Sequence, residues 1–137
     1  MKTAKDLMTS PAECLAPDET ILTAARMLSK YDVGSMPIVD GDDLVGVVTD
    51  RDIVINAVAK GLDPKETPIS KIASTNVVTV EASAPASEVA SLMAEHQVRR
   101  LPVVDGGKVV GMVAQADVAR DLDDGTTGEV VEEISQA

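Results

Sequence analysis

The sequence predicts an α+β protein built from two copies of a β-α-β-β-α unit. With a shift of 65 residues and no gap, identical residues coincide: Pro37 and Pro102, Gly46 and Gly111, Asp52 and Asp117. One register held over so many positions indicates an internal repeat. Within each copy, apolar residues recur first at helical spacing and then in short runs separated by turn residues. At 137 residues, 45% of them hydrophobic, the chain can bury a core of its own.

The repeat also predicts how the chain is divided. We expect a first repeat over residues 1–63, a linker over 64–69, a second repeat over 70–123 and an acidic tail over 124–137. The end of the chain carries several acidic and no basic residues from Asp121 onward. The tail is predicted to be solvated after a short helix near residues 129–134. Packing of Val130, Val131 and Ile134 against a dimer partner is the open alternative.

Each repeat is predicted to begin with a short helix, at residues 4–8 and 70–73, followed by a short strand at 13–15 and 77–80. A longer helix follows at about residues 20–30. The apolar stripes of this helix and its counterpart are Ile21, Ala24, Ala25 and Leu28, and Ala86, Val89, Ala90 and Met93. Asp18 and Ser83 are the predicted N-caps, and Pro85 lies near the second helix start.

The second half of each repeat has the pattern of a hairpin followed by a helix. Residues 36–39 and 101–104 are short apolar runs, each ending in an Asp-Gly turn signal. Residues 44–48 and 109–113 are the predicted partner strands. Helices are expected from about Asp50 and Gln115.

The composition of the chain argues against binding to nucleic acid or membranes and against a secreted or membrane-spanning protein. The formal net charge of −11 opposes binding to nucleic acid or to an anionic membrane, because both require neutralisation of phosphate by Lys and Arg. Cys14 is the single cysteine, so no internal disulfide is possible and a reducing compartment fits. No apolar run of about 18 residues occurs. We therefore expect a soluble cytoplasmic protein.

The sequence offers little for catalysis or metal binding. Cys14 and His96 cannot fill a tetrahedral metal site within one chain, and only a dimer could combine two copies. Neither a Gly-x-Ser-x-Gly elbow nor a GxxxxGK[ST] phosphate loop is present. We expect no catalytic residues, no metal ligands and no enzymatic activity.

Two motifs in each copy resemble the CBS domain. They are residues 34–40 with 46–52, and residues 98–105 with 111–117. The resemblance covers nearly the whole chain up to about residue 123, and residues 49–64 and 96–100 also resemble stand-alone bacterial CBS-pair proteins. It implies two repeats packed sheet to sheet about a pseudo-twofold axis, as in a Bateman module. It further implies two related clefts for an adenosine ligand, and association as a homodimer.

Carried over by motif position, the resemblance implies a first ligand cleft between the repeats. Its residues would be Thr49, Arg51, Asp52, Thr75, Val77, Val98, Arg99, Arg100 and Pro102. A ribose diol presents two donors, which the Asp52 carboxylate can accept. Phosphate suits arginines and the free N–H groups at the start of the helix near Asp50. Adenine would lie between Val77, Val98 and Pro102.

Some of these residues also have plain structural interpretations. Thr49 and Asp52 have nearly the spacing of a capping box, and capping is compatible with ligand binding. Arg99 and Arg100 are adjacent before a strand, so at most one is expected to reach a ligand.

The second implied cleft departs from the pattern. Asp117 remains, but Thr49 corresponds to Ala114, which carries no hydroxyl. The opposing segment offers Ser35 and Pro37 and no cation. We therefore expect one competent site and a second that is empty or weak.

The resulting hypothesis is a regulatory module that senses AMP, ADP, ATP or a related adenosine ligand and transmits the signal through a homodimer to an effector protein. It requires no cofactor and binds neither nucleic acid nor membrane. The alternative is a ligand-free scaffold for protein interaction. A third possibility is the regulatory piece of an enzyme or transporter that is encoded separately.

Overall fold

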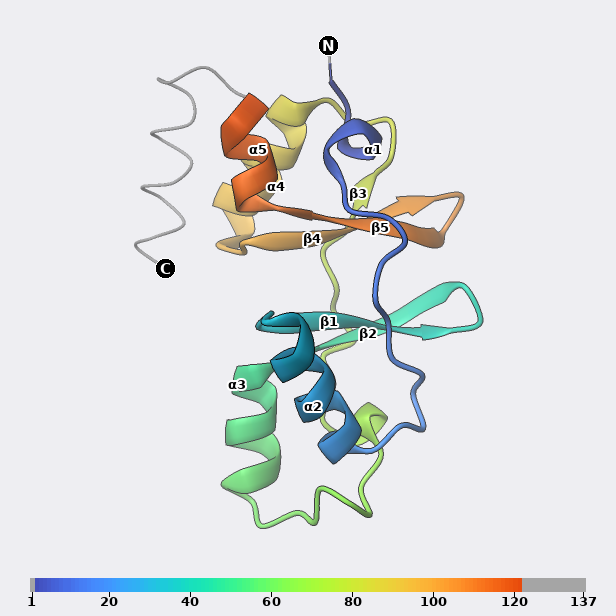
Figure 1. The fold of residues 1–137 in the computed structure, drawn as a ribbon, viewed down its shortest axis with the longest axis vertical. Helices are drawn as coiled ribbons and strands as arrows, with labels where there is room; N and C mark the ends of the chain where they lie inside the picture. The colour runs from blue at the N-terminus through green and yellow to red at the C-terminus, as the bar shows by residue number, and fades with distance from the viewer. Residues whose placement is uncertain (1, 122–137) are drawn as a thin grey trace. The chain divides into compact units, whose positions relative to one another are not determined.

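The structure is a computed structural model that describes residues 2–121 (Figure 1). Its elements in chain order are α1 (Ala4–Leu7), α2 (Ile21–Tyr31), β1 (Ser35–Asp40), β2 (Asp43–Thr49), α3 (Asp50–Asp52), the π-helix η1 (Ile53–Val58), the 3₁₀-helix η2 (Ile69–Lys71), β3 (Val80–Glu81), α4 (Ala86–His96), β4 (Arg100–Asp105), β5 (Lys108–Ala114) and α5 (Gln115–Asp121). This mixture of helices and strands confirms the predicted α+β class. The predicted acidic tail, residues 124–137, lies outside the described residues.

The chain forms two compact units. The first unit is Glu13–Val77. The second unit joins Met1–Ala12 to Val78–Ala137, of which residues 2–12 and 78–121 are described. The units therefore do not coincide with the sequence repeats, because the leading segment of each repeat packs on the body of the other repeat.

Hydrogen bonds show this exchange of leading segments in detail. In the first unit, Ile21 at the start of α2 donates its N–H to the carbonyl of Thr67 at 3.0 Å. In the second unit, Ala86 at the start of α4 donates its N–H to the carbonyl of Lys2 at 3.1 Å. Both donors and both acceptors are related by the shift of 65 residues. The two segments therefore make equivalent contacts, each satisfying a backbone donor that a helix start leaves open.

The first unit is built around an antiparallel hairpin. β1 and β2 pair with Ser35 opposite Thr49 and Asp40 opposite Asp43. α2 begins after the N-cap Thr20, whose side chain accepts from the N–H of Thr23 at 3.2 Å. Buried side chains from α2, the hairpin, η1 and η2 form one core: Leu15, Ile21, Ala24, Leu28, Met36, Ile38, Val48, Ala57, Ile69 and Ile72.

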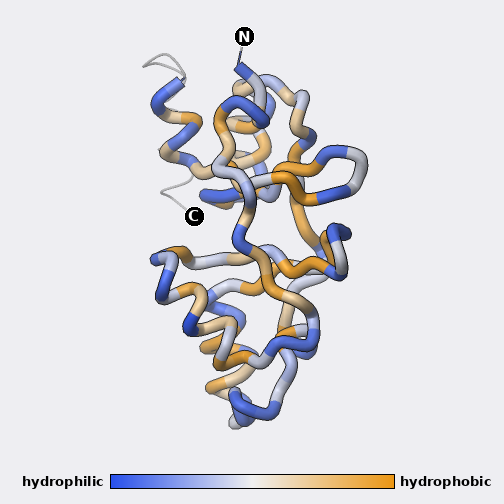
Figure 2. Tube along the Cα trace, turned by 45° about the vertical axis from the view of Figure 1, so that its right-hand side comes forward, coloured by the Kyte–Doolittle hydropathy of each residue, from blue (hydrophilic) through white to orange (hydrophobic). Residues whose placement is uncertain are grey.

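The second unit repeats the hairpin and adds a strand. β4 and β5 are antiparallel with Arg100 opposite Ala114, and β3 runs parallel to β4 with Val80 opposite Val103. Its core includes Ala4 of the exchanged segment together with Val80, Ala82, Ala84, Val89, Ala90, Met93, Leu101, Val103, Val113 and Val118. Figure 2 shows both hairpins with hydrophobic strands and hydrophilic turns, because the strands contribute to the cores and the turns are exposed.

One glycine in each hairpin allows the exchanged segment to approach. A Cβ on Gly46 would lie 2.9 Å from the carbonyl oxygen of Ser74, and a Cβ on Gly111 would lie 2.8 Å from that of Thr9. Thr9 and Met112 exchange two backbone hydrogen bonds, of 2.8 and 3.0 Å. These glycines coincide in the repeat because the same close contact occurs twice.

Several predicted details differ from the structure. The N-cap of α2 is Thr20 and not Asp18, and the N-cap of α4 is Pro85 and not Ser83. Thr20 can accept from a helical N–H, whereas the start of α4 is supplied by the Lys2 carbonyl instead of a side chain. The strand predicted at residues 13–15 is reduced to a parallel bridge between Leu15 and Ile38.

Candidate functional site

The segment that the sequence marks most strongly is the end of β2 and the start of α3, residues 49–52, which we call the Asp52 corner. Thr49 Oγ1 accepts from the N–H of Asp52 at 3.0 Å, and Asp52 Oδ2 accepts from the N–H of Thr49 at 2.9 Å. This is the predicted capping box. It fixes the Asp52 carboxylate, which is half-buried, at the end of the strand. Among residues 2–121, Asp52 Oδ1 accepts no hydrogen bond, so one edge of the carboxylate is available.

The backbone of this corner does not offer the free N–H groups that we expected. Asp50 donates its N–H to the carbonyl of Gly34 at 2.9 Å, and Arg51 donates its N–H to Asp50 Oδ1 at 2.8 Å. The N–H of Asp52 is bound to Thr49, and that of Ile53 to the carbonyl of Asp50. The expectation that these N–H groups are free is therefore wrong. The cause is that the capping box, the Asp50 side chain and the carbonyls of Gly34 and Asp50 satisfy these donors.

The equivalent segment of the second unit, residues 114–117, is here called the Asp117 corner. Asp117 Oδ2 accepts from the N–H of Ala114 at 2.9 Å, which reproduces one half of the capping box. The other half is missing because Ala114 has no hydroxyl. Asp117 Oδ1 is bound by Nη2 of Arg120 at 2.5 Å. The two equivalent aspartates thus differ in whether their second oxygen is engaged.

Each corner lies beside the pre-proline segment of its own repeat. Ser35 is paired with Thr49 across the β1–β2 hairpin, and Arg100 is paired with Ala114 across the β4–β5 hairpin. Gln115 donates its N–H to the carbonyl of Arg99 at 2.7 Å. These contacts join residues of the same repeat. The ligand clefts implied by the resemblance would instead join residues of different repeats, and that assignment remains a proposal.

The remaining predicted residues divide between the two units. Thr75 and Val77 belong to the first unit, where the bridge between Ser74 and Val47 holds their segment along β2. Thr75 is exposed and Val77 is half-buried. Val98, Arg99, Arg100 and Pro102 belong to the second unit, as does Asp117, whereas Ser35 and Pro37 belong to the first. Both arginines are exposed, Val98 is half-buried and Pro102 is buried.

The cysteine has the environment of a protonated thiol. Burial raises the pKa of Cys14, and the negative charge of Glu13 adds to the effect. A raised thiol pKa lowers the thiolate fraction at neutral pH, which is the opposite of what a nucleophilic cysteine needs. Within residues 2–121, no three His, Cys, Asp or Glu side chains come together as a group that could hold a metal ion. Cys14 lies in the first unit and His96 in the second.

Comparison with known proteins defines the class of this chain. A family model described as the CBS domain matches residues 4–58 and 69–124, which are the two sequence repeats. The chain therefore belongs to the CBS domain family and carries two copies of the domain. No helix in the described part of the chain is long and apolar enough to cross a membrane.

Particular relatives are similar over most of their length. Hypoxic response protein 1 of Mycobacterium tuberculosis is 42% identical over 123 residues, which is 89% of this chain and 86% of the relative. A crystal structure of hypoxic response protein I with two coordinated zinc ions has a TM-score of 0.80 and 42% identity, covering 89% of this chain and all of the other.

Two other solved relatives contain adenosine ligands. The CBS domain pair of protein MJ0100, in complex with 5′-methylthioadenosine and S-adenosyl-L-methionine, is 32% identical with a TM-score of 0.76, covering 88% of this chain and 94% of that one. CBSX2 in complex with AMP is 27% identical with a TM-score of 0.76, covering 88% and 95%. Nucleoside binding thus occurs among the relatives of this chain.

Sequence reasoning overlooked Arg120. The residue falls in the helix after the Asp117 corner, and its counterpart in the first repeat is the apolar Ile55. The signal was present in the repeat itself, because an arginine three residues after an aspartate in a helix is within reach of its carboxylate.

Proposed function

We propose that this chain is a regulatory CBS-pair module that binds an adenosine-containing ligand, AMP, ADP, ATP or a related molecule, through the Asp52 corner. The observation that carries the proposal is the Asp52 carboxylate, which the capping box holds through Oδ2 while Oδ1 accepts no hydrogen bond among residues 2–121. A fixed carboxylate with a free edge is suited to accept the two hydroxyl groups of a ribose. The adenosine ligands of two solved relatives support the same chemistry.

We assign the phosphate contacts to arginine side chains. The N–H groups of residues 49–53 already have hydrogen-bond partners within the protein, so they are not assigned to the anion. Arg51, Arg99 and Arg100 are exposed and carry the charge that phosphate oxygens require. Thr75, Val77, Val98 and Pro102 remain the proposed contacts to the nucleoside. Ser35, Pro37 and Asp117 remain the proposed residues of a second, weaker site.

We propose that the module transmits ligand binding through a homodimer to an effector protein, and that it acts in the cytoplasm without catalysing a reaction. A ligand can shift such an assembly only by binding its forms with different affinity. Sedimentation velocity with and without AMP measures whether a dimer forms and whether the ligand changes it. A monomer that is unaffected by AMP would exclude this route of transmission.

Calorimetry on nucleotide-stripped protein tests the ligand proposal. The ligands are AMP, ADP, ATP, NAD and S-adenosylmethionine, and the variants are Asp52→Asn and Asp117→Asn. Asparagine keeps one acceptor for the capping box but removes the charge and one acceptor oxygen. We expect about one equivalent of tightly bound ligand, which Asp117→Asn retains and Asp52→Asn loses, leaving only weak binding at the second site. If none of the ligands gives a heat of binding, the proposal is rejected and the ligand-free scaffold is favoured.

The scaffold alternative has its own readout. A protein partner that binds wild type and Asp52→Asn with equal affinity, in the absence of any nucleotide, would support it. In that case the corner would serve only as a helix cap.

A further inference from the structure

Asp52 and Asp117 are equivalent in the repeat, but their carboxylates have different neighbours. Each Oδ2 accepts from the backbone N–H three residues earlier, at 2.9 Å in both corners. Oδ1 of Asp117 is bound to Arg120, whereas Oδ1 of Asp52 has no hydrogen bond among residues 2–121. The difference is thus confined to Oδ1, one of the two oxygens to which a ribose diol would donate.

The side chain three residues after each aspartate accounts for this difference. Arg120 of α5 coincides with Ile55 of η1 under the shift of 65 residues. Ile55 is 48% exposed and has no donor, so it can neither bind nor neutralise Asp52. Arg120 extends along the helix surface to a carboxylate that is only 16% exposed. The same fold therefore carries one open and one internally paired aspartate.

We infer that Arg120 is a specificity-determining residue that weakens adenosine binding at the Asp117 corner by occupying Asp117 Oδ1, and thereby restricts tight binding to the Asp52 corner. This inference rests on the proposed function. A ribose diol donates to both carboxylate oxygens, so the guanidinium bound to Oδ1 competes with it for that oxygen. Ala114 weakens the same corner separately, because it leaves the helix start without a hydroxyl cap.

The exposure of Arg120 limits the size of the effect. Its side chain is 75% exposed, and ion pairs of this kind contribute little because water competes for both partners. Displacing the guanidinium should therefore reduce ligand affinity by about two- to fivefold. The effect should shrink at high salt, since exposed charges are screened.

Reciprocal exchange of the two residues tests the inference by calorimetry with AMP. Ile55→Arg places a guanidinium three residues after Asp52, and Ile55→Gln is a matched control that is long and polar but uncharged. We expect the dissociation constant for AMP to rise about two- to fivefold in Ile55→Arg at low salt, and to stay at the wild-type value in Ile55→Gln. The exposure of Ile55 allows both side chains to be accommodated without disturbing the core.

The reciprocal substitution, Arg120→Ile, tests the Asp117 corner separately from the Asp52 corner. In an Asp52→Asn background, Arg120→Ile should increase the affinity for AMP about two- to fivefold relative to Asp52→Asn alone, and Arg120→Lys should increase it less. A lower affinity in Arg120→Ile would overturn the inference, because it would show that Arg120 binds the ligand. An unchanged affinity in both Ile55→Arg and Arg120→Ile would also overturn it.

The two proposals fail in different ways. If wild type and every variant bind no adenosine ligand, the proposed function is rejected and the inference falls with it. If wild type binds through Asp52 but the exchange has no effect, the inference alone is rejected. Urea unfolding of each variant identifies any loss of binding that results from a loss of folded protein.

Discussion

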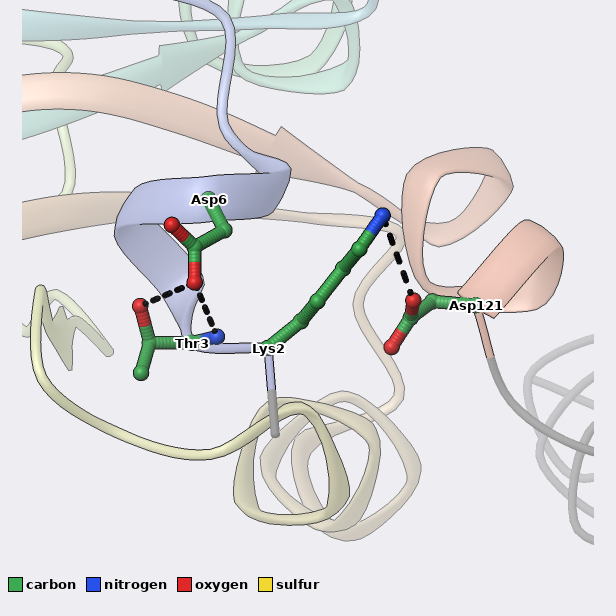
Figure 3. Close-up of polar contacts among 4 residues, drawn as sticks. All are labelled: Lys2, Thr3, Asp6 and Asp121. Carbon is green, nitrogen blue, oxygen red and sulfur yellow. Dashed lines mark hydrogen bonds and ion pairs between the residues drawn. The ribbon is translucent and has the colours of Figure 1, made fainter.

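The Lys2 ammonium lies 3.6 Å from the Asp121 carboxylate, so the second residue of the chain is paired with the end of α5 (Figure 3). The pair belongs to the second unit, in which residues 2–12 pack on the body of the second repeat. Lys2 is 63% exposed, so the pair itself adds little to stability. The backbone and core contacts of the same segment should matter far more.

Removing residues 2–12 should therefore destabilise the second unit much more than removing the Lys2 charge. The deletion loses the fully buried Ala4 and the hydrogen bonds of Ala4, Lys5 and Thr9 to the unit. We expect Lys2→Ala to lower the free energy of unfolding by less than about 1 kcal/mol. The deletion should lower it by several-fold more, as measured by urea unfolding. Equal effects of the two changes would show that the segment is not docked as described.

Gly111→Ala should destabilise the protein by about 1–3 kcal/mol, because the new Cβ meets the backbone of the docked segment. It would lie 2.8 Å from the carbonyl oxygen of Thr9. Gly34→Ala is the matched control, since the nearest atom to its Cβ would be Asp50 Oδ2 at 3.4 Å. Thermal or urea unfolding measures both. A Gly111→Ala variant as stable as Gly34→Ala would contradict the close approach.

The capping boxes can be exchanged between the repeats. Thr49→Ala removes the hydroxyl that accepts from the N–H of Asp52 and should cost about 1 kcal/mol of stability. Ala114→Thr supplies the missing hydroxyl at the equivalent position and should add stability of a similar size. Thr75→Ala, at an exposed residue outside the helices, is the control and should change unfolding little. Destabilisation by Ala114→Thr would show that the second helix start cannot accept the cap.

The Thr3–Asp6 contact should make stability depend on pH in acid. Asp6 Oδ2 accepts from the N–H of Thr3 at 2.9 Å and from its hydroxyl at 3.1 Å (Figure 3). The backbone bond first, and then the hydroxyl bond, lower the pKa of Asp6 below its ordinary value of 3.8. A lowered pKa in the folded state contributes stability above the unfolded value, and this contribution is lost as the pH falls through the folded value.

The comparison that isolates this group is wild type against Asp6→Asn, unfolded with urea from pH 7 to pH 2.5. The difference in stability should be constant above about pH 5 and should decrease as the pH falls below the ordinary value of 3.8. Lys60→Ala, which alters an exposed charge in the first unit, should show no such decrease. A difference that grows in acid would contradict the direction of the pKa shift.

Much of the local structure could be predicted from the sequence, because it depends on contacts between near neighbours. The 65-residue shift, the apolar stripe of α2 and the Asp-Gly turns predict the α+β class and the order of its main elements. The spacing of Thr49 and Asp52 predicts the capping box, which hydrogen bonds of 3.0 and 2.9 Å confirm. The N-caps of α2 and α4 were wrong by two residues, because the choice depends on which carbonyl or hydroxyl reaches the helix start.

The tertiary structure alone decided which leading segment packs on which repeat. Residues 2–12 and 67–77 occupy equivalent positions under the shift but share no identical residue, and the sequence predicts that each belongs with the repeat that follows it in the chain. Tertiary hydrogen bonds establish the arrangement, among them those from the N–H of Ala86 to the carbonyl of Lys2 and from the N–H of Ile21 to the carbonyl of Thr67. The free edge of Asp52 and the occupied edge of Asp117 were decided in the same way. The residue type alone leaves Ile55 unable to bind Asp52. Arg120 can reach Asp117, but only the direction of its side chain in the fold decides that it does.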